Sequence, residues 1–432
     1  MNLKKELRIH DTNVSRRKKK PNSENLIASV LTLLAFLYYF VPGAQFGLSP
    51  TFFGRLRNLI AVCFFFYSLK NVTYFFRGKY VLFNLALLVY CIVQILSVAL
   101  NIDTVSSLSA TVVSGGEYLD ISGADSARAV IFNCMMYLGT ALQFEYWSNR
   151  RKSFQIIKVL FFAFAALTFI ADFNAVFIVD RNNPSARLIG DKFTLSYLNL
   201  FLCSIYHLVH PHLRGRSKMI LIGLVLCAMF IAYYVECTTA MLGGIVYGLL
   251  VLLVPLKGWK RLKSPWILIL TTVVLDIGFF FFSTLFMEND FVRFIVEDIL
   301  NEDSTLTGRL RIYSEIRQAF VDSPWLGFGQ GNSFVVSYLY ADAPDVQNGL
   351  MDLFLQTGLL GCIAFLFYLY AAFRQIETEY WHIFPILALI YTMVVISMVE
   401  IPFNAHFVFF VMLLLLKRPK ILKKRIVANV RS

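Results

Sequence analysis

The stretch YVLFNLALLVYCIVQILSVAL, residues 80–100, contains no charged residue. A run of about 20 apolar residues is long enough to cross the hydrocarbon core of a bilayer as one helix. The pattern recurs along the chain and predicts twelve spans: 26–42, 56–70, 80–100, 128–147, 154–172, 193–210, 219–236, 239–256, 266–286, 349–372, 383–399 and 405–416. The expected fold is therefore an all-α polytopic membrane protein with about 12 transmembrane helices.

The composition favours a membrane protein over a soluble one. Hydrophobic residues make up 58% of the chain and charged residues only 16%, whereas soluble domains carry more charge. The net charge of +13 is concentrated near the two ends, so no soluble basic domain that would bind nucleic acid is predicted. We expect these ends to contact anionic membrane lipids. The basic start leads directly into the first span, so no cleavable signal peptide is predicted.

The seven cysteines lie in or beside apolar runs. Their spacing is not that of a metal site, and they are expected to behave as small membrane hydrophobes. No Asp-rich ligand motif is evident either. The sequence therefore predicts no metal and no cofactor.

Basic residues set the expected orientation. With the N-terminal tail in the cytoplasm, about 30 of the 40 basic residues fall inside and about 10 outside, as the positive-inside rule requires. The predicted organisation is a basic cytoplasmic tail (1–25), helices 1–9 (26–286), a large extracytoplasmic loop (287–348), helices 10–12 (349–416) and a second basic cytoplasmic tail (417–432).

The large loop carries arginines on the outer side, against the topological bias. The stretches 291–300 and 308–320 have the apolar spacing of amphipathic helices. In the second, Arg309 lies near the apolar face and Arg311 points away; the face itself consists of Ile312, Tyr313, Ile316 and Phe320. This helix is expected to end before Pro324, and the glycines that follow allow a tight turn.

The chain re-enters the membrane at a polar pair, Gln347 and Asn348. Asn348 is expected to cap the next helix, and Gly358 and Gly361 to allow close helix packing. Asp276 lies in the middle of a predicted span, where a charge is costly, so we expect it to pack against polar groups of another helix.

Two stretches taken together resemble a known family. GRLRIYSEIRQAFVDSPWLGFGQGNSF (308–334), followed by QNGLMDLFLQTGLLGCIAFLFY (347–368), is similar to the O-antigen ligase and O-antigen polymerase superfamily of bacterial membrane glycosyltransferases. The shared pattern is Gly-Arg at the start of an outer helix, a turn rich in Pro and Gly, a polar pair, nine residues and Gly-x-x-Gly. The stretches 186–202 and 237–253 resemble two further recurring segments.

The resemblance implies a GT-C-type glycosyltransferase architecture in the bacterial cytoplasmic membrane. It implies an oligosaccharide on undecaprenyl pyrophosphate as substrate, with a chain-length regulator and a flippase as candidate partners. In the ligase-type pattern the polar pair begins with histidine; here it begins with Gln347, which cannot accept a proton at ordinary pH. We therefore predict a polymerase of O-antigen, capsule or exopolysaccharide. It would transfer a growing glycan onto the non-reducing end of a lipid-linked repeat unit at the outer leaflet.

The outer arginines suit a diphosphate leaving group. A guanidinium stays charged and binds phosphate oxygens through paired hydrogen bonds, so no metal is required. We predict that the pyrophosphate is bound by Arg309, Arg187, Arg311 and Arg181, with Arg309 also stabilising the transition state. The alternative is that these are solvated loop residues paired with neighbouring Asp180, Asp191 or Glu315.

The group that receives the proton of the acceptor hydroxyl is left open by the sequence. Asp345 and His406 are the predicted catalytic candidates beside Arg309, and Glu400 and Asp191 are further ones. The alternative for His406 is an interfacial residue at the end of a span. Gln347 and Asn348 are predicted to contact the substrate.

Two other functions stay open. One is an O-antigen ligase, against which Gln347 argues. The other is a lipid-linked oligosaccharide flippase or another transporter, which is expected to show internal repeats and charged residues along the membrane interior. The sequence shows no repeat, and its unexpected charge lies in the outer loop instead.

Overall fold

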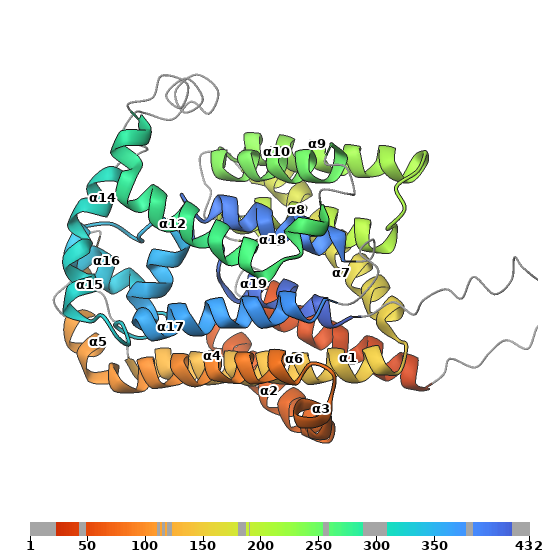
Figure 1. Ribbon diagram of the computed structural model, residues 1–432, viewed down its shortest axis with the longest axis horizontal. Coiled ribbons are helices and arrows are strands. Elements are labelled where there is room, and N and C mark those ends of the chain that lie inside the picture. The colour runs from red at the N-terminus through yellow and green to blue at the C-terminus, as the bar shows by residue number, and fades with distance from the viewer. Residues whose placement is uncertain are drawn as a thin grey trace, which may run out of the picture.

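The computed structural model describes residues 23–42, 49–109, 113–114, 117–118, 123–179, 187–189, 191–253, 259–287, 309–376 and 383–416. These residues are helical apart from connecting loops and one antiparallel pair of short strands, β1 (Val113–Ser114) and β2 (Glu117–Tyr118). Figure 1 shows helices of different lengths gathered into one bundle.

Each of the twelve predicted spans coincides with a helix. These helices are α1 (Ser23–Phe40), α2 (Pro50–Leu69), α4 (Val81–Leu100), α6 (Gly123–Asn149), α7 (Ser153–Phe173), α8 (Lys192–Val209), α9 (Arg216–Tyr234), α10 (Thr238–Leu252), α12 (Pro265–Met287), α17 (Gly349–Arg374), α18 (Phe384–Ile396) and α19 (Ala405–Met412). The short elements are α3 (Val72–Arg77), α5 (Ile102–Ser109), the π-helix η3 (Asn174–Ile178), α11 (Trp259–Leu262), α14 (Arg309–Glu315), α15 (Arg317–Asp322), α16 (Ser333–Ala341) and the 3₁₀-helix η7 (Leu413–Leu415).

Among the described residues, seven helices are long and apolar enough to cross a membrane: α1, α2, α4, α7 with η3, α9, α12 and α17. The helices α10, α18 and α19 with η7 are apolar but shorter. The chain is thus a multi-pass membrane protein with a helical membrane domain, which confirms the all-α polytopic part of the predicted fold class. The full count of twelve spans and the orientation of the termini stay predictions.

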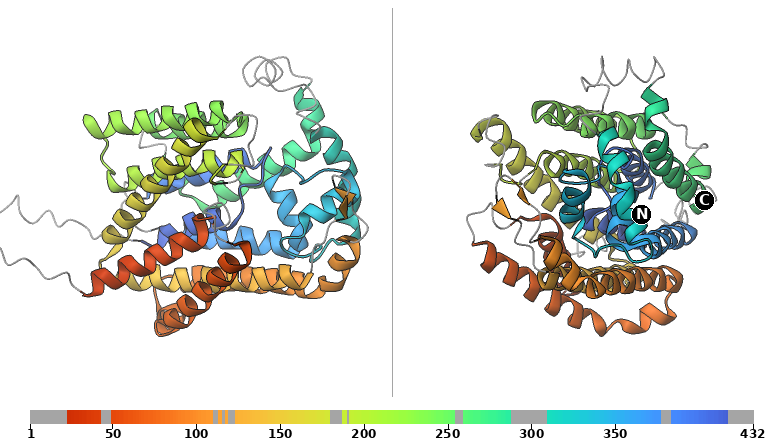
Figure 2. Two further views of the ribbon diagram at one scale, coloured as in Figure 1. Left: turned by 180° about the vertical axis from the view of Figure 1, so that it is seen from behind. Right: turned by 90° about the vertical axis from the view of Figure 1, so that its left-hand side faces the viewer.

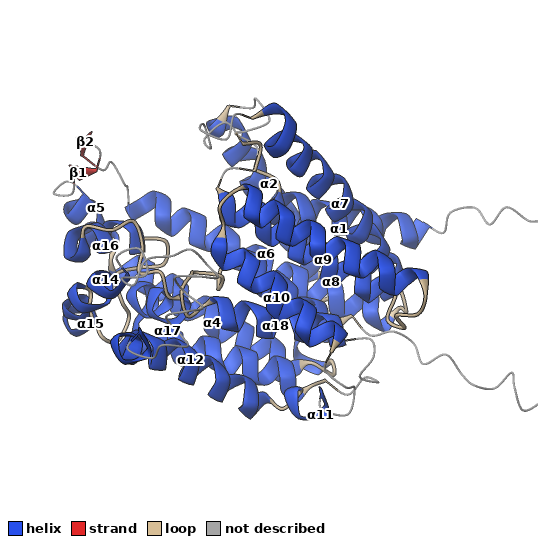
Figure 3. Cartoon of the chain, turned by 90° about the horizontal axis from the view of Figure 1, so that it is seen from above, coloured by secondary structure: helices blue, strands red, loops and turns tan. Residues whose placement is uncertain are grey.

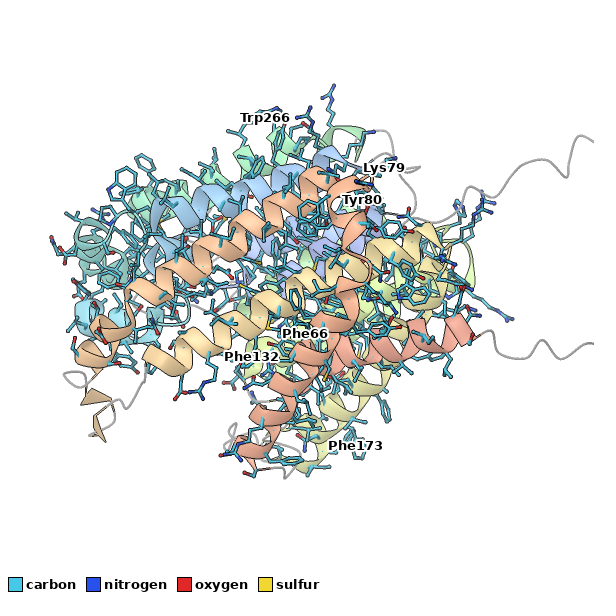
Figure 4. The ribbon with its side chains drawn as sticks, turned by 90° about the horizontal axis from the view of Figure 1, so that it is seen from below. Phe66, Lys79, Tyr80, Phe132, Phe173 and Trp266 are labelled. Atoms are coloured by element: carbon cyan, nitrogen blue, oxygen red, sulfur yellow. The ribbon has the colours of Figure 1, made fainter. Side chains whose placement is uncertain are left out.

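Large apolar side chains project from the outside of the bundle. Phe173 of α7 is 48% exposed and Trp266 of α12 is 67% exposed, and Figure 4 shows both at its periphery. Such a surface would associate in water, whereas lipid tails solvate it in a bilayer.

Two long helices, α8 and α17, each pack against several neighbours in the bundle. α8 packs against α7, α9 and α18, and α17 packs between α4 and α12. Figure 1 and the rear view in Figure 2 show α14, α15 and α16 together at one end, opposite the connection from α8 to α9. Figure 3 shows β1 and β2 at that same end, beside α5. We call this the loop end of the bundle.

The predicted amphipathic helix over 308–320 is formed by two short helices, α14 and α15, which meet at Ile316. The predicted apolar face is confirmed, because Ile312, Tyr313 and Ile316 are buried while Arg311 is exposed. α15 ends at Asp322, before Pro324, as predicted. The other predicted amphipathic stretch, 291–300, lies outside the described residues.

α17 is interrupted at Gly358, whose φ of 62° lies in the left-handed region. The glycine-rich segment 324–329 fills this interruption with four backbone hydrogen bonds. They run from Phe328 N to Leu355 O (2.9 Å), from Gly329 N to Gln356 O (2.9 Å), from Leu359 N to Pro324 O (2.8 Å) and from Leu360 N to Trp325 O (3.2 Å). The backbone groups that the broken helix cannot pair internally are therefore satisfied by the loop, as a membrane interior demands.

The same segment is also bonded to α4. The Ser97 hydroxyl donates to the carbonyl of Leu326 at 2.6 Å, and the Asn101 amide donates to the carbonyl of Gly327 at 3.0 Å. α4 and α17, which are far apart in sequence, thus both bind the segment 324–329. These bonds fix the loop end against the membrane domain.

Replacing Gly358 by alanine is expected to destabilise this junction. A Cβ at residue 358 would overlap the carbonyl group of Trp325, and the left-handed backbone adds its own cost, so a loss of about 3 kcal/mol is expected. The control is Gly278→Ala in α12, where a Cβ meets nothing within 4 Å. Thermal unfolding of the purified variants compares the two, and an equal Tm for both would contradict the assignment.

Candidate functional site

Arg309 is the first residue of α14, and its side chain is only 8% exposed. α14 packs against α12 and α16, so its inner face lies between a helix of the membrane domain and a short helix of the loop end. A guanidinium stays charged when it is buried. The placement agrees with the predicted position of Arg309 near the apolar face and does not fit a solvated loop residue.

The segment before α17 brings Asp345 beside the predicted polar pair. The Asp345 Oδ1 atom accepts a hydrogen bond from the backbone N–H of Gln347 at 2.9 Å. Gln347 has a φ of 50°, a left-handed value that costs a non-glycine residue about 1–2 kcal/mol. Burial raises the pKa of Asp345, and the Gln347 hydrogen bond and the nearby Arg309 charge oppose that rise.

Tyr313 connects three segments of the site. Its hydroxyl lies 3.0 Å from the carbonyl oxygen of Gln347 and 3.2 Å from that of Met398. The ring is 1% exposed, and burial raises the pKa of Tyr313, so the hydroxyl keeps its proton and donates. One side chain thereby links the helix of Arg309, the segment of Asp345 and the loop that follows α18.

A buried polar network supports this junction. Asn348 accepts from the backbone N–H of Met351 at 3.1 Å, which confirms the predicted cap of α17. Its amide also donates to the carbonyls of Asp276 and Met398, at 3.1 and 3.2 Å. The Ser397 hydroxyl donates to Asp276 Oδ2 at 2.9 Å, so Asp276 packs against polar groups of another helix, as predicted.

Glu400 lies on the loop between α18 and α19 and is 8% exposed. Burial raises the pKa of Glu400 to about 8, and the negative charge of Asp345 adds to this rise. The hydrogen bond from the Ile401 N–H and the charge of Arg309 oppose it, and Asp191 adds a smaller rise. Arg309, Asp345 and Glu400 therefore form one group of interacting charges at the loop end, which we call the charged cluster.

The other predicted arginines differ among themselves. Arg187 is 7% exposed and lies on the loop before α8, so it too is no solvated loop residue. Arg311 is exposed and pairs with Glu315 at 3.3 Å across one helical turn, which is the alternative considered for these residues. Arg181 lies outside the described residues.

His406 takes a structural position in α19. Its Nε2 lies 2.7 Å from the carbonyl oxygen of Tyr39, so Nε2 carries the proton and donates it. The imidazole stacks on the ring of Phe40 with centroids 4.7 Å apart. This geometry joins α19 to the end of α1, and a catalytic role for His406 stays a prediction.

Asp191 also has a local role. Its Oδ1 accepts from the backbone N–H of Thr194 at 2.6 Å and its Oδ2 accepts from the Thr194 hydroxyl at 2.9 Å. Asp191 is thus the N-cap of α8, which places its charge at the edge of the charged cluster.

No group of three or more His, Cys, Asp or Glu side chains that could hold a metal ion occurs within the described ranges. From the sequence, Tyr313 is predicted only as one residue of an apolar face. Tyr197 of α8 is not predicted as a site residue. Tyr197 is a buried residue of the first turns of α8 whose hydroxyl is within range of the charges of Glu400, Asp191 and Arg309.

The middle of the chain matches a known protein family. Residues 195–366 match the family model described as O-antigen ligase. The chain carries an O-antigen ligase family domain. Members of this family are membrane enzymes that transfer glycans and act on lipid-linked glycans. The comparison with curated proteins and that with solved structures found no match.

The O-antigen ligase domain contains only part of the site. It runs from α8 to α17 and includes Arg309, Asp345, Gln347 and Asn348, whereas Arg187, Glu400 and His406 lie outside the matched residues. The charged cluster is therefore completed by a loop that follows the domain in the chain, and this loop is joined to the domain through Tyr313 and Asn348.

Proposed function

We propose that the protein is a polysaccharide polymerase. It would transfer a growing glycan from undecaprenyl pyrophosphate onto the non-reducing end of a lipid-linked repeat unit at the outer leaflet of a bacterial cytoplasmic membrane. The observation that carries the proposal is the burial of Arg309 at the loop end, where its charge acts on Asp345 and Glu400, within a domain of a family that acts on lipid-linked glycans.

The proposed step is a displacement at the anomeric carbon of the donor sugar. The acceptor hydroxyl oxygen forms the new glycosidic bond, and the bond between the anomeric carbon and the diphosphate oxygen breaks. Its electron pair leaves with the lipid diphosphate, where Arg309 stabilises the developing charge. The proton of the acceptor hydroxyl passes to Glu400.

Glu400 is proposed as the base because of its burial and charge. A carboxylate with a pKa of about 8 holds a proton far more strongly than one in water, and a base is most effective when its pKa lies near the operating pH. Asp345 would then act by holding Gln347 in place and by raising the proton affinity of Glu400. Arg187 is proposed as a second phosphate ligand because it too is buried.

Gln347 favours a polymerase over a ligase. Its backbone N–H and carbonyl are engaged by Asp345 and Tyr313, and its side-chain amide cannot accept a proton at ordinary pH. A ligase that depends on histidine at this place would lack its base here. The ligase is kept as the second candidate because the matched family is described by that activity.

Deletion of the gene tests the proposal. Lipid-linked glycans are extracted from the deletion strain and separated on a gel. We expect single lipid-linked repeat units to accumulate. Full-length polymer that is not attached to its final acceptor would favour the ligase instead, and repeat units trapped on the inner leaflet would favour a flippase.

A further inference from the structure

Tyr197 has a buried hydroxyl that no group in the described part of the chain binds. The residue lies in the first turns of α8 and is 6% exposed. Among the described residues its hydroxyl oxygen has no hydrogen-bond partner. A buried polar group without a partner costs free energy, so native proteins seldom keep one without a reason.

The direction of this side chain follows from the packing of α8. Residues four apart lie on the same face of a helix, so Tyr197 shares a face with Phe201. The Phe201 ring lies 6.1 Å from the imidazole of His406, at the start of α19. One turn nearer the loop end, Tyr197 therefore faces the loop that carries Glu400.

The charges around the hydroxyl agree with this direction. Glu400 is the charged group that acts on it most strongly, and Asp191 and Arg309 act more weakly. Among these charged groups, a carboxyl group therefore has the largest influence on the hydroxyl. Tyr313, the other buried tyrosine of the cluster, has its hydroxyl engaged by two backbone carbonyls, whereas that of Tyr197 is available.

We propose that the Tyr197 hydroxyl binds the attacking hydroxyl of the acceptor sugar, together with Glu400. This assignment rests on the proposed function. A phenol hydroxyl both donates and accepts, as a sugar hydroxyl does, so the pair is complementary. Tyr197 forms no covalent bond and takes no proton in the reaction; it binds the acceptor oxygen in the ground state and in the transition state alike.

Kinetics with separate donor and acceptor test this role. The purified full-length chain receives a lipid-linked repeat unit as donor. The acceptor is the repeat-unit oligosaccharide freed of its lipid diphosphate, which can accept but cannot donate. In Tyr197→Phe the KM for the acceptor is expected to rise about tenfold. The KM for the donor is expected to stay unchanged, and kcat to change little, because the lost bond is already made in the bound state.

Stability supplies the matched control. Because the Tyr197 hydroxyl has no hydrogen-bond partner among the residues that the structure describes, Tyr197→Phe is expected to leave Tm unchanged or to raise it. Tyr391→Phe removes a hydroxyl that donates to the carbonyl of Leu262 at 2.8 Å, so its Tm is expected to fall.

Three outcomes would overturn the role of Tyr197 while the wild-type chain is active. They are an unchanged KM for the acceptor, a rise in the KM for the donor instead, and a fall in Tm as large as that of Tyr391→Phe. If the wild-type chain also transfers no glycan from one lipid-linked repeat unit to another, the proposed function itself is overturned, and the role falls with it.

Discussion

Arg309→Ala is expected to remove long-chain polymer while the protein level in the membrane stays normal. The guanidinium is buried in the charged cluster, where a charge that meets a developing anion contributes about 10²–10³-fold to the rate. Arg309→Lys should restore only part of the activity, because an ammonium lacks the paired donors of the guanidinium. The measurement is a gel of lipid-linked glycans from cells that carry each variant.

Arg311→Ala is the matched control for this experiment. Arg311 lies on the same short helix, but it is exposed and pairs with Glu315. An exposed ion pair contributes little to stability, so the variant should give polymer of wild-type length. Normal polymer in Arg309→Ala, or equal loss in both variants, would exclude the assigned role.

Glu400→Gln should lower the rate of glycan transfer by about 10²–10⁴-fold, the usual contribution of a general base. In the wild type the base must be ionised, so the rate should rise with pH through about pH 8 and then level off. Asp345→Asn should move this rise to lower pH, because the negative charge of Asp345 is one cause of the raised pKa of Glu400. The measurement is the pH dependence of kcat/KM with purified protein.

The raised pKa of Glu400 also predicts that the stability of the protein depends on pH. The pKa of Glu400 is raised on folding from the ordinary 4.5 to about 8, so the folded protein holds the proton more strongly than the unfolded chain. The free energy of unfolding should therefore fall as pH rises between these values, and Glu400→Gln should remove that part of the fall. Glu315 lies on the exposed side of α14. Glu315→Gln should change neither the pH dependence of kcat/KM nor that of the free energy of unfolding. A wild-type pH profile in Glu400→Gln would exclude it as the base.

Much of the membrane domain could be predicted from composition and periodicity. Apolar runs of sufficient length mark helices because the backbone must pair internally in lipid, and every predicted span is a helix in the structure. The break in α17 could not be predicted this way. Gly358 reads as a small residue for helix packing, and only the segment 324–329, which bonds into the gap, shows that the helix is interrupted there.

The site was predictable where a local pattern carries the information. The apolar face beside Arg309 indicates its burial, and the position of Asn348 indicates a helix cap. Contacts between distant segments carry no such local signal. The electrostatic influence of Arg309 on Glu400 depends on how α12, α14, α17 and α18 pack. Tyr197 reads as one of many aromatic residues in a chain whose aromatic content is 16%.

The bonds from Ser97 and Asn101 to the segment 324–329 set an order of assembly for the nascent protein. α4 is synthesised long before that segment, and the halves of α17 that enclose it are synthesised after it. Neither half can take its final position until the segment has returned to α4. We therefore expect maturation of the loop end to be a late, post-insertion event, even though every membrane helix can enter the bilayer as the ribosome delivers it.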